Sequence, residues 1–173
     1  AYPITAVGFD NQGETFVLWD AGTGEPLTPA IVWQDKRAAA LCEAWQGKVD
    51  AAWLRHKTGL LLDSYFSAPK LRVVLDAQPD LAAMARAGTL RFGTLDSWVL
   101  WHLTPDHRHV TDASTAARTL LYDIHARAWD DELLALFDVP RALLPEIVPA
   151  AGLVAELDFG AARPLPLHAL LVD

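Results

Sequence analysis

Short apolar segments separated by polar, glycine-containing stretches make up the N-terminal part of the chain. Ile4–Phe9 and Thr15–Trp19 are rich in β-branched and aromatic side chains, which is typical of buried strands. Ala30–Trp33 is a third such segment, and the loop before it contains Gly22 and Gly24. Two apolar segments around a short glycine-containing loop predict that Thr15–Trp19 and Ala30–Trp33 form a β-hairpin.

The rest of the chain contains helical segments marked by residues that favour helix ends. Asp35 is predicted to cap a helix from about Lys36 to Trp45, and Pro79 and Gly88 stand at the start and end of another. The other predicted elements are the helices Asp50–Lys57 (ended by Thr58-Gly59), Leu95–Leu103 and one from Asp130 or Asp131 to Phe137, a helical turn over Pro140–Ile147, the mixed segment Val110–Tyr122, and the strands Leu90–Thr94 and Leu165–Val172. This mixture predicts an α/β architecture.

Composition excludes several classes of protein. The 173 residues are 52% apolar and 21% charged, which indicates a folded chain with a substantial core. The net charge is −8 and no basic run occurs, so we expect no nucleic-acid partner. No apolar stretch reaches about 18 residues and no signal peptide is visible, so we expect neither a membrane partner nor secretion. Cys42 is the only cysteine, which suits a cytoplasmic protein.

Both ends of the chain fall close to predicted strands. The strand Ile4–Phe9 begins almost at the N-terminus, and Asp173 follows directly on Leu165–Val172. Domains rarely end with the last residue of a buried strand. We therefore expect residues 1–173 to be a fragment of a longer enzyme.

One short motif could bind phosphate. Asp20-Ala21-Gly22-Thr23 offers a carboxylate, a glycine and a hydroxyl after a strand, which can hold magnesium and a phosphoryl group. The same residues make an ordinary turn, and the helix N-terminus that would support a phosphate is missing. We favour the turn. The chain has neither a Walker A motif nor a G-x-G-x-x-G motif.

Other candidate residues are open to a structural or a functional interpretation. His107 and His109 lie near two aspartates, but the stretch is typical of a solvated turn rather than of a metal site. Core packing best explains Trp98 and Trp101, which lie three apart on one helix. Trp33 stands at a strand end, where its ring could equally pack in the core or face a ligand. Glu14 and Asp173 follow strands, which is where α/β sheets usually bind ligands, although taken singly each carboxylate favours a structural role.

Taken in order, a series of short motifs resembles the FGGY carbohydrate kinases, and within them the glycerol kinases. The likeness runs over nearly the whole chain. The motifs are Asn11-Gln12-x-Glu14-Thr15, Ala30-Ile31-Val32-Trp33-Gln34 with Arg37, Thr58-Gly59-Leu60, Asp63-x-Tyr65-Phe66-Ser67, Pro69-Lys70, Phe92-Gly93-Thr94-Leu95-Asp96-Ser97-Trp98, Val110-Thr111-Asp112, Ala117-Arg118-Thr119-Leu120-Leu121, Trp129-Asp130-Asp131 and Pro140-x4-Pro145-Glu146. Their order and spacing make the resemblance specific.

The resemblance implies a ribonuclease H-like, actin-type fold and a substrate-binding part of the N-terminal kinase domain. It implies phosphorylation of a small polyol or sugar by ATP with Mg²⁺, and it leaves association into a homo-oligomer open. Glu14, Trp33 and Tyr65 match substrate-contacting positions, and Asp173 matches the carboxylate that acts as general base. The family's phosphate-binding Asp-x-Gly-Thr motif belongs upstream of Asn11. The resemblance thus implies that this motif and the C-terminal ATP-binding domain are absent from the chain.

Two positions depart from the family pattern. Gly13 stands where the glycerol kinases have an arginine, so a hydrogen-bond donor to the polyol is lost, which costs roughly 1.5–3 kcal/mol. The glycine is also expected to open space for a larger acceptor, such as a pentulose. Val73 stands where the family usually has tryptophan, a position expected to serve packing. The alternatives are therefore a xylulokinase-like pentulose kinase and a sugar-binding module that has lost catalysis.

Overall fold

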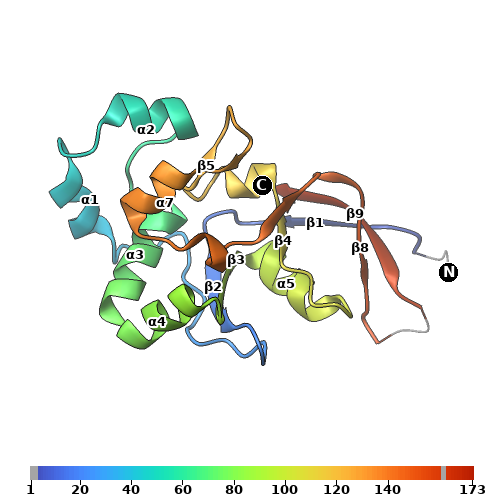
Figure 1. Cartoon of the computed structure of the whole chain (residues 1–173). Coiled ribbons are helices and arrows are strands. Elements are labelled where there is room, and N and C mark those ends of the chain that lie inside the picture. Colours follow the sequence, from blue (N-terminus) through green and yellow to red (C-terminus); the bar gives the residue numbers. More distant parts are fainter. Residues whose placement is uncertain (1–3, 161–162) are drawn as a thin grey trace.

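The structure, a computed structural model, describes residues 4–160 and 163–173 of the chain. Strands and helices alternate along it, which confirms the predicted α/β class (Figure 1). A three-stranded sheet with one helix against it lies on one side, and most of the other helices gather on the opposite side. Residues 1–3 and 161–162 of the expected domain lie outside the described residues.

The three-stranded sheet joins the two ends of the described chain. β1 (Val7–Asn11) is parallel to β9 (Leu165–Val172), with Asn11 opposite Val172, and β8 (Ala151–Leu157) is antiparallel to β9. The prediction for Leu165–Val172 is confirmed. The predicted strand Ile4–Phe9 is displaced, because pairing with β9 extends it to Asn11 and leaves residues 4–6 outside it.

The predicted hairpin is wrong. β2 (Phe16–Asp20) pairs along its whole length with β3 (Leu90–Thr94), which is distant in sequence. The segment after β2 returns beside it but forms only isolated bridges, between Phe16 and Ile31 and between Trp19 and Pro26. Proline has no N–H to donate to a ladder, and Pro26 and Pro29 both lie in this segment, so it does not become a regular strand.

Most predicted helices are confirmed, with their ends set by local signals. Asp50 caps α2 by accepting hydrogen bonds from two backbone N–H groups, and Gly59 ends it in the left-handed conformation with φ 73°. Asp130 caps α7 by accepting a hydrogen bond from the backbone N–H of Leu133. The confirmed elements are α2 (Ala51–Thr58), α4 (Pro79–Ala87), β3, α5 (Leu95–Leu103) and α7 (Asp131–Phe137). The helical turn predicted over Pro140–Ile147 is confirmed only as η1 (Arg141–Leu143), because Glu146 and Ile147 belong to a strand.

Two helix predictions need correction. Helix α1 spans Ala39–Trp45 and has no side-chain cap, because the carboxylate of Asp35 is bound to the N–H and guanidinium of Arg37. Helix α3 (Ser67–Ala77) was not predicted at all. Proline near its start hides the helical pattern, yet a proline is tolerated there because first-turn N–H groups have no helical partner. The remaining elements are β4 (Val110–Asp112), α6 (Ala113–Ala116), β5 (Tyr122–Asp123), β6 (Ala128–Trp129) and β7 (Glu146–Val148).

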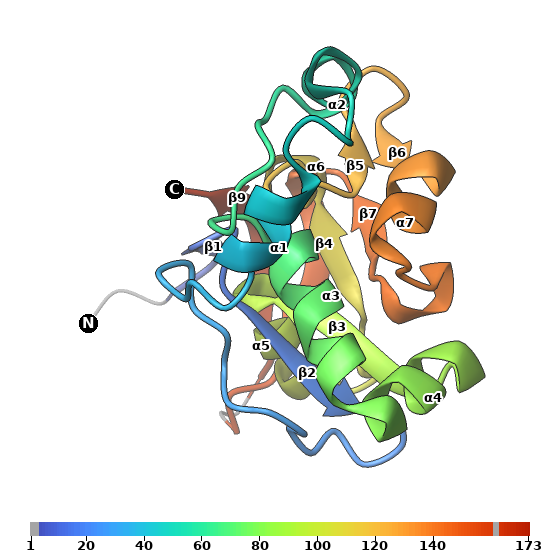
Figure 2. The ribbon, with the colours of Figure 1, turned by 90° about the vertical axis from the view of Figure 1, so that its left-hand side faces the viewer.

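The β2–β3 pair lies at the centre of the core, covered on both faces. Figure 2 shows α3 running across it. Phe16, Leu18 and Phe92 pack with the apolar side of α3, and all three are almost completely buried. On the other face Trp19 packs against Trp98 and Trp101 of α5, with ring centroids 5.2 and 5.8 Å apart. The expectation that these two tryptophans serve packing is therefore confirmed.

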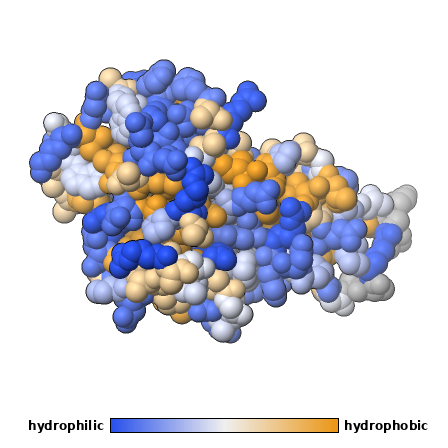
Figure 3. All heavy atoms as spheres, in the orientation of Figure 1, coloured by the Kyte–Doolittle hydropathy of each residue, from blue (hydrophilic) through white to orange (hydrophobic). Residues whose placement is uncertain are grey.

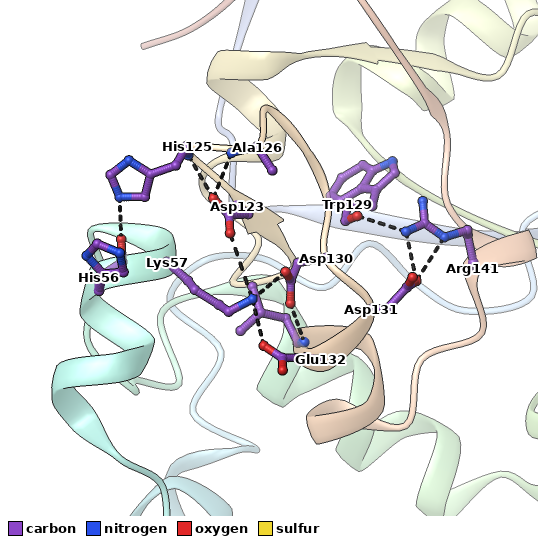
Figure 4. A network of polar contacts seen from close by, with 11 residues as sticks. His56, Lys57, Asp123, His125, Ala126, Trp129, Asp130, Asp131, Glu132 and Arg141 are labelled. Carbon is purple, nitrogen blue, oxygen red and sulfur yellow. Dashed lines mark hydrogen bonds and ion pairs between the residues drawn. The ribbon is translucent and has the colours of Figure 1, made fainter.

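A charged cluster fastens α2 to the β5–β6 hairpin and to α7 (Figure 4). The Nζ of Lys57 lies 2.5 Å from Oδ2 of Asp130, 2.8 Å from Glu132 and 3.8 Å from Asp123. Hydrogen bonds from Asp130 and Glu132 raise the pKa of Lys57 above its ordinary value. These contacts hold together segments that are distant in sequence, which is a structural role.

Apolar surface remains over the three-stranded sheet. Figure 3 shows apolar side chains gathered over this side of the molecule, and Leu153 and Leu171 are 65% and 46% exposed. Among the described residues, none of the helices is both long enough and apolar enough to span a bilayer.

Candidate functional site

The turn between β1 and β2 presents Glu14 and is held by its neighbours. The hydroxyl of Thr15 donates to Oε1 of Gln12 at 3.1 Å and accepts from the backbone N–H of Trp33 at 3.2 Å. The second bond joins two segments far apart in sequence. The two predicted substrate-binding positions Glu14 and Trp33 are thereby kept next to each other.

Glu14 is buried and paired with a cation. Its side chain is only 7% exposed, and its Oε1 accepts a hydrogen bond from Nε of Arg118 at 2.6 Å. The guanidinium of Arg118 also lies over the ring of Phe66, 5.2 Å from the centroid. The carboxylate of Glu14 therefore has a fixed orientation, with an oxygen left to accept a further hydrogen bond.

Trp33 and Tyr65 form an aromatic pair beside this turn. Their ring centroids lie 5.6 Å apart with the planes tilted by 57°. Both side chains are partly buried. Two partly exposed rings can pack against a carbon chain, while the phenol can donate or accept a hydrogen bond.

Gly13 does not leave an open space. A Cβ atom at this position would lie 2.6 Å from Cγ2 of Val172 and 2.8 Å from Cγ of Arg118, both closer than real Cβ contacts. The expectation that glycine opens room for a larger acceptor is therefore wrong at this position. Val172 and Arg118 already fill the volume that a side chain would take.

Asp173 lies at the same edge of the sheet as this turn. Its backbone N–H donates to the carbonyl of Asn11 at 3.3 Å, and its side chain is exposed. Because β1 and β9 are parallel, their carboxyl ends meet at one edge, which is where α/β sheets usually bind ligands. Trp33 contacts Tyr65 directly and is bonded to Thr15, the neighbour of Glu14. Asp173 approaches this turn through Asn11 and Val172.

A hollow of about 450 Å³ lies next to the aromatic pair. Tyr65 is one of its walls, and Glu14, Trp33 and Asp173 do not line it. The other lining residues are Lys36, Gly59, Leu60, Leu61, Asp63 and Phe66. The four sequence-predicted residues thus border this hollow only through Tyr65.

The Asp20–Thr23 motif is a turn, as favoured from the sequence. Oδ1 of Asp20 accepts hydrogen bonds from the N–H groups of Gly22 and Thr23, each at 2.8 Å, and from the Thr23 hydroxyl. These bonds hold the pKa of Asp20 below its ordinary value. The donors that a phosphate would need already point at this carboxylate, so the motif does not fit ATP or its magnesium.

The two histidines considered for a metal site each hydrogen-bond to a backbone carbonyl. Nε2 of His109 donates to the carbonyl of Phe92 at 2.7 Å, and Nδ1 of His107 lies 2.9 Å from the carbonyl of Trp101. Within residues 4–160 and 163–173 no group of three His, Cys, Asp or Glu side chains has metal-binding geometry.

Two residues of this region were not assigned a role from the sequence. Arg118 and Lys70 both fall within the motifs quoted above, but the motifs alone do not show what their side chains contact. For Lys70 the available signal was its place among Ala68, Pro69 and Leu71, because a lysine buried with such residues needs hydrogen-bond partners.

The chain is similar to known proteins over nearly its whole length. Residues 2–169 match the model of the FGGY family of carbohydrate kinases, N-terminal domain. The chain is 53% identical over 156 residues to a glycerol kinase of Herminiimonas arsenicoxydans, covering 90% of this chain and 31% of that protein. It is 49% identical over 176 residues to a glycerol kinase of Rhodospirillum rubrum, covering 100% of this chain and 35% of that protein. The chain thus spans about a third of the length of these relatives.

Solved structures show the same fold. The crystal structure of Plasmodium falciparum glycerol kinase with ADP superposes with a TM-score of 0.94 at 30% identity, covering 99% of this chain and 34% of that one. The crystal structure of a gluconate kinase from Lactobacillus acidophilus superposes with a TM-score of 0.86 at 20% identity, covering 100% of this chain and 35% of that one. The expected ribonuclease H-like, actin-type fold is therefore confirmed. On its sequence and its fold, the chain belongs to the FGGY family of carbohydrate kinases.

Proposed function

We propose that this chain is the acceptor-binding part of a longer kinase that transfers a phosphoryl group from ATP to a hydroxyl of a small polyol or sugar. The observation that carries the proposal is that Glu14, Trp33 and Tyr65 come from separate segments and lie in one region, with Asp173 at the neighbouring strand end. The relatives named glycerol kinase, at about half identity over most of the chain, favour a polyol such as glycerol.

Each residue has a role that follows from its chemistry. Asp173 accepts the proton of the attacking hydroxyl, as a general base does. Glu14, oriented by Arg118, accepts a hydrogen bond from another hydroxyl of the acceptor. Trp33 and Tyr65 pack on the carbon chain and exclude water from it.

ATP and Mg²⁺ are the phosphoryl donor and the metal in this proposal. Mg²⁺ neutralises phosphate charge during such transfers. The Asp20 turn does not fit them, so we assign their binding to parts of the longer protein outside residues 1–173, and the isolated chain is expected to be inactive.

A pentulose kinase of the xylulokinase type is the second candidate, because Gly13 removes the arginine typical of glycerol kinases. A non-catalytic sugar-binding module is the third. The test uses the full-length protein that carries this chain. It is incubated with ATP, Mg²⁺ and either glycerol, xylulose or ribulose, and the phosphorylated product is identified by mass spectrometry.

Phosphorylation of glycerol supports the first proposal, and preference for a pentulose supports the second. If an acceptor raises the melting temperature but no product forms with any of them, the chain belongs to a binding module and the kinase proposal is wrong.

A further inference from the structure

Lys70 is a fully buried lysine in the first turn of α3, with 0% of its surface exposed. Its Nζ donates to three backbone carbonyls, those of Tyr65 at 2.8 Å, Val32 at 3.2 Å and Glu14 at 3.4 Å. No carboxylate lies within ion-pair distance of it in the part of the chain that the structure describes.

The three carbonyls belong to the backbone of the candidate site. Glu14 and Tyr65 contribute their own carbonyls, and Val32 directly precedes Trp33. These residues come from three segments that are separate in sequence. An ammonium group has three N–H donors and no acceptor, so its bonding capacity matches three carbonyls converging on one point.

Burying this ammonium has a cost. Burial disfavours the charged form of Lys70 and lowers its pKa to about 8. An apolar side chain of similar volume could fill this space, but it could not donate to the carbonyls that converge there. The ammonium therefore adds what packing alone does not, a connection between three separate segments of the backbone.

We propose that Lys70 is a positioning residue for acceptor binding, which fixes the backbone of Glu14, Val32-Trp33 and Tyr65 so that their side chains face one ligand. The inference rests on the proposed function. Lys70 does not touch the acceptor; it acts through the three segments that it joins. Its loss therefore weakens acceptor binding without affecting the nucleotide.

The test compares Lys70→Met with wild type in the full-length protein, with the exposed Lys48→Met as matched control. The probes are glycerol and xylulose as acceptors, and ATP–Mg²⁺. Lys70→Met loses the three hydrogen bonds and is expected to have a lower melting temperature than wild type while remaining folded. It is expected to raise the KM of the preferred acceptor at least tenfold and to leave the KM of ATP within twofold. A variant with unchanged KM for the acceptor would overturn the inference.

If Lys70→Met does not fold, the wild-type protein provides the second measurement. An amine has two N–H donors, so the third carbonyl loses its bond when Lys70 deprotonates. The charged groups that act on Lys70 are Asp35 and Glu14, which favour the ammonium, and Lys36 and Arg37, which oppose it. The dissociation constant of the acceptor is expected to rise at least threefold between pH 7 and pH 9.5, and a constant value contradicts the inference.

The two failures are distinguishable. If wild type phosphorylates neither glycerol nor xylulose and binds neither, the proposed function fails. If wild type is active and Lys70→Met binds the acceptor equally well, only the role of Lys70 fails.

Discussion

The Nε of Arg118 donates to Oε1 of Glu14 at 2.6 Å, across 104 positions of sequence. The ion pair, with its buried carboxylate, connects the β1–β2 turn to the segment after α6. The guanidinium compensates the negative charge of the buried carboxylate. The pair therefore links the stability of the fold to the orientation of a proposed acceptor-binding residue.

Replacing Arg118 by glutamine is expected to leave the carboxylate of Glu14 buried without its cation. Such a loss costs about 1–3 kcal/mol in the free energy of unfolding, and we expect the lower half of this range because Arg118 is itself 34% exposed. Urea denaturation measures it, with the exposed Arg86→Gln as control. Acceptor affinity should fall together with stability. Equal unfolding free energies for the variant and wild type would show that the pair contributes nothing.

Gly13 and Val172 are expected to be coupled. Gly13→Ala places a Cβ 2.6 Å from Cγ2 of Val172, and overpacking of this kind costs about 1–3 kcal/mol. Val172→Ala removes that methyl group. The double variant should therefore be more stable than the sum of the single changes by roughly 1 kcal/mol. Strict additivity in thermal or urea unfolding would contradict the close approach.

His109 is expected to make stability depend on pH. Burial lowers its pKa from 6.5 to about 4, so between these values the unfolded chain binds a proton that the folded chain does not. Stability should therefore fall as the pH drops, by up to about 2 kcal/mol between pH 7 and pH 5. His109→Gln can still donate to the carbonyl of Phe92 but does not titrate. Urea unfolding at the two pH values should show a smaller loss for the variant, and identical losses would exclude His109 as the cause.

Elements of the fold could be predicted from the sequence where the residues that determine them lie close together along the chain. Asp50, Gly59 and Pro79 mark helix ends by interactions with their own neighbours, and the structure confirms the helices they delimit. The partner of β2 was missed because β3 lies some 70 positions further on, and only tertiary packing selects it over the nearer segment.

The same distinction applies to the candidate site. The resemblance of the motifs identified Glu14, Trp33 and Tyr65 as candidate positions. A sequence pattern could not predict the contacts that these residues make in the fold. Lys70 and Arg118 were missed as functional residues because their partners are distant carbonyl groups and a distant carboxylate. The space beside Gly13 is likewise filled by Val172, which lies there because β9 pairs with β1, and this pairing could not be predicted from the sequence.

The proposed base at Asp173 gives the most direct test of the kinase account. Asp173→Asn in the full-length protein removes the proton acceptor while keeping the size of the side chain, and the exposed Asp106→Asn serves as control. Steady-state kinetics with ATP–Mg²⁺ and the preferred acceptor should show kcat lowered by about 10²–10⁴ and a KM changed by less than about threefold. A kcat equal to that of wild type would contradict the assignment of Asp173 and, with it, the acceptor site proposed for this chain.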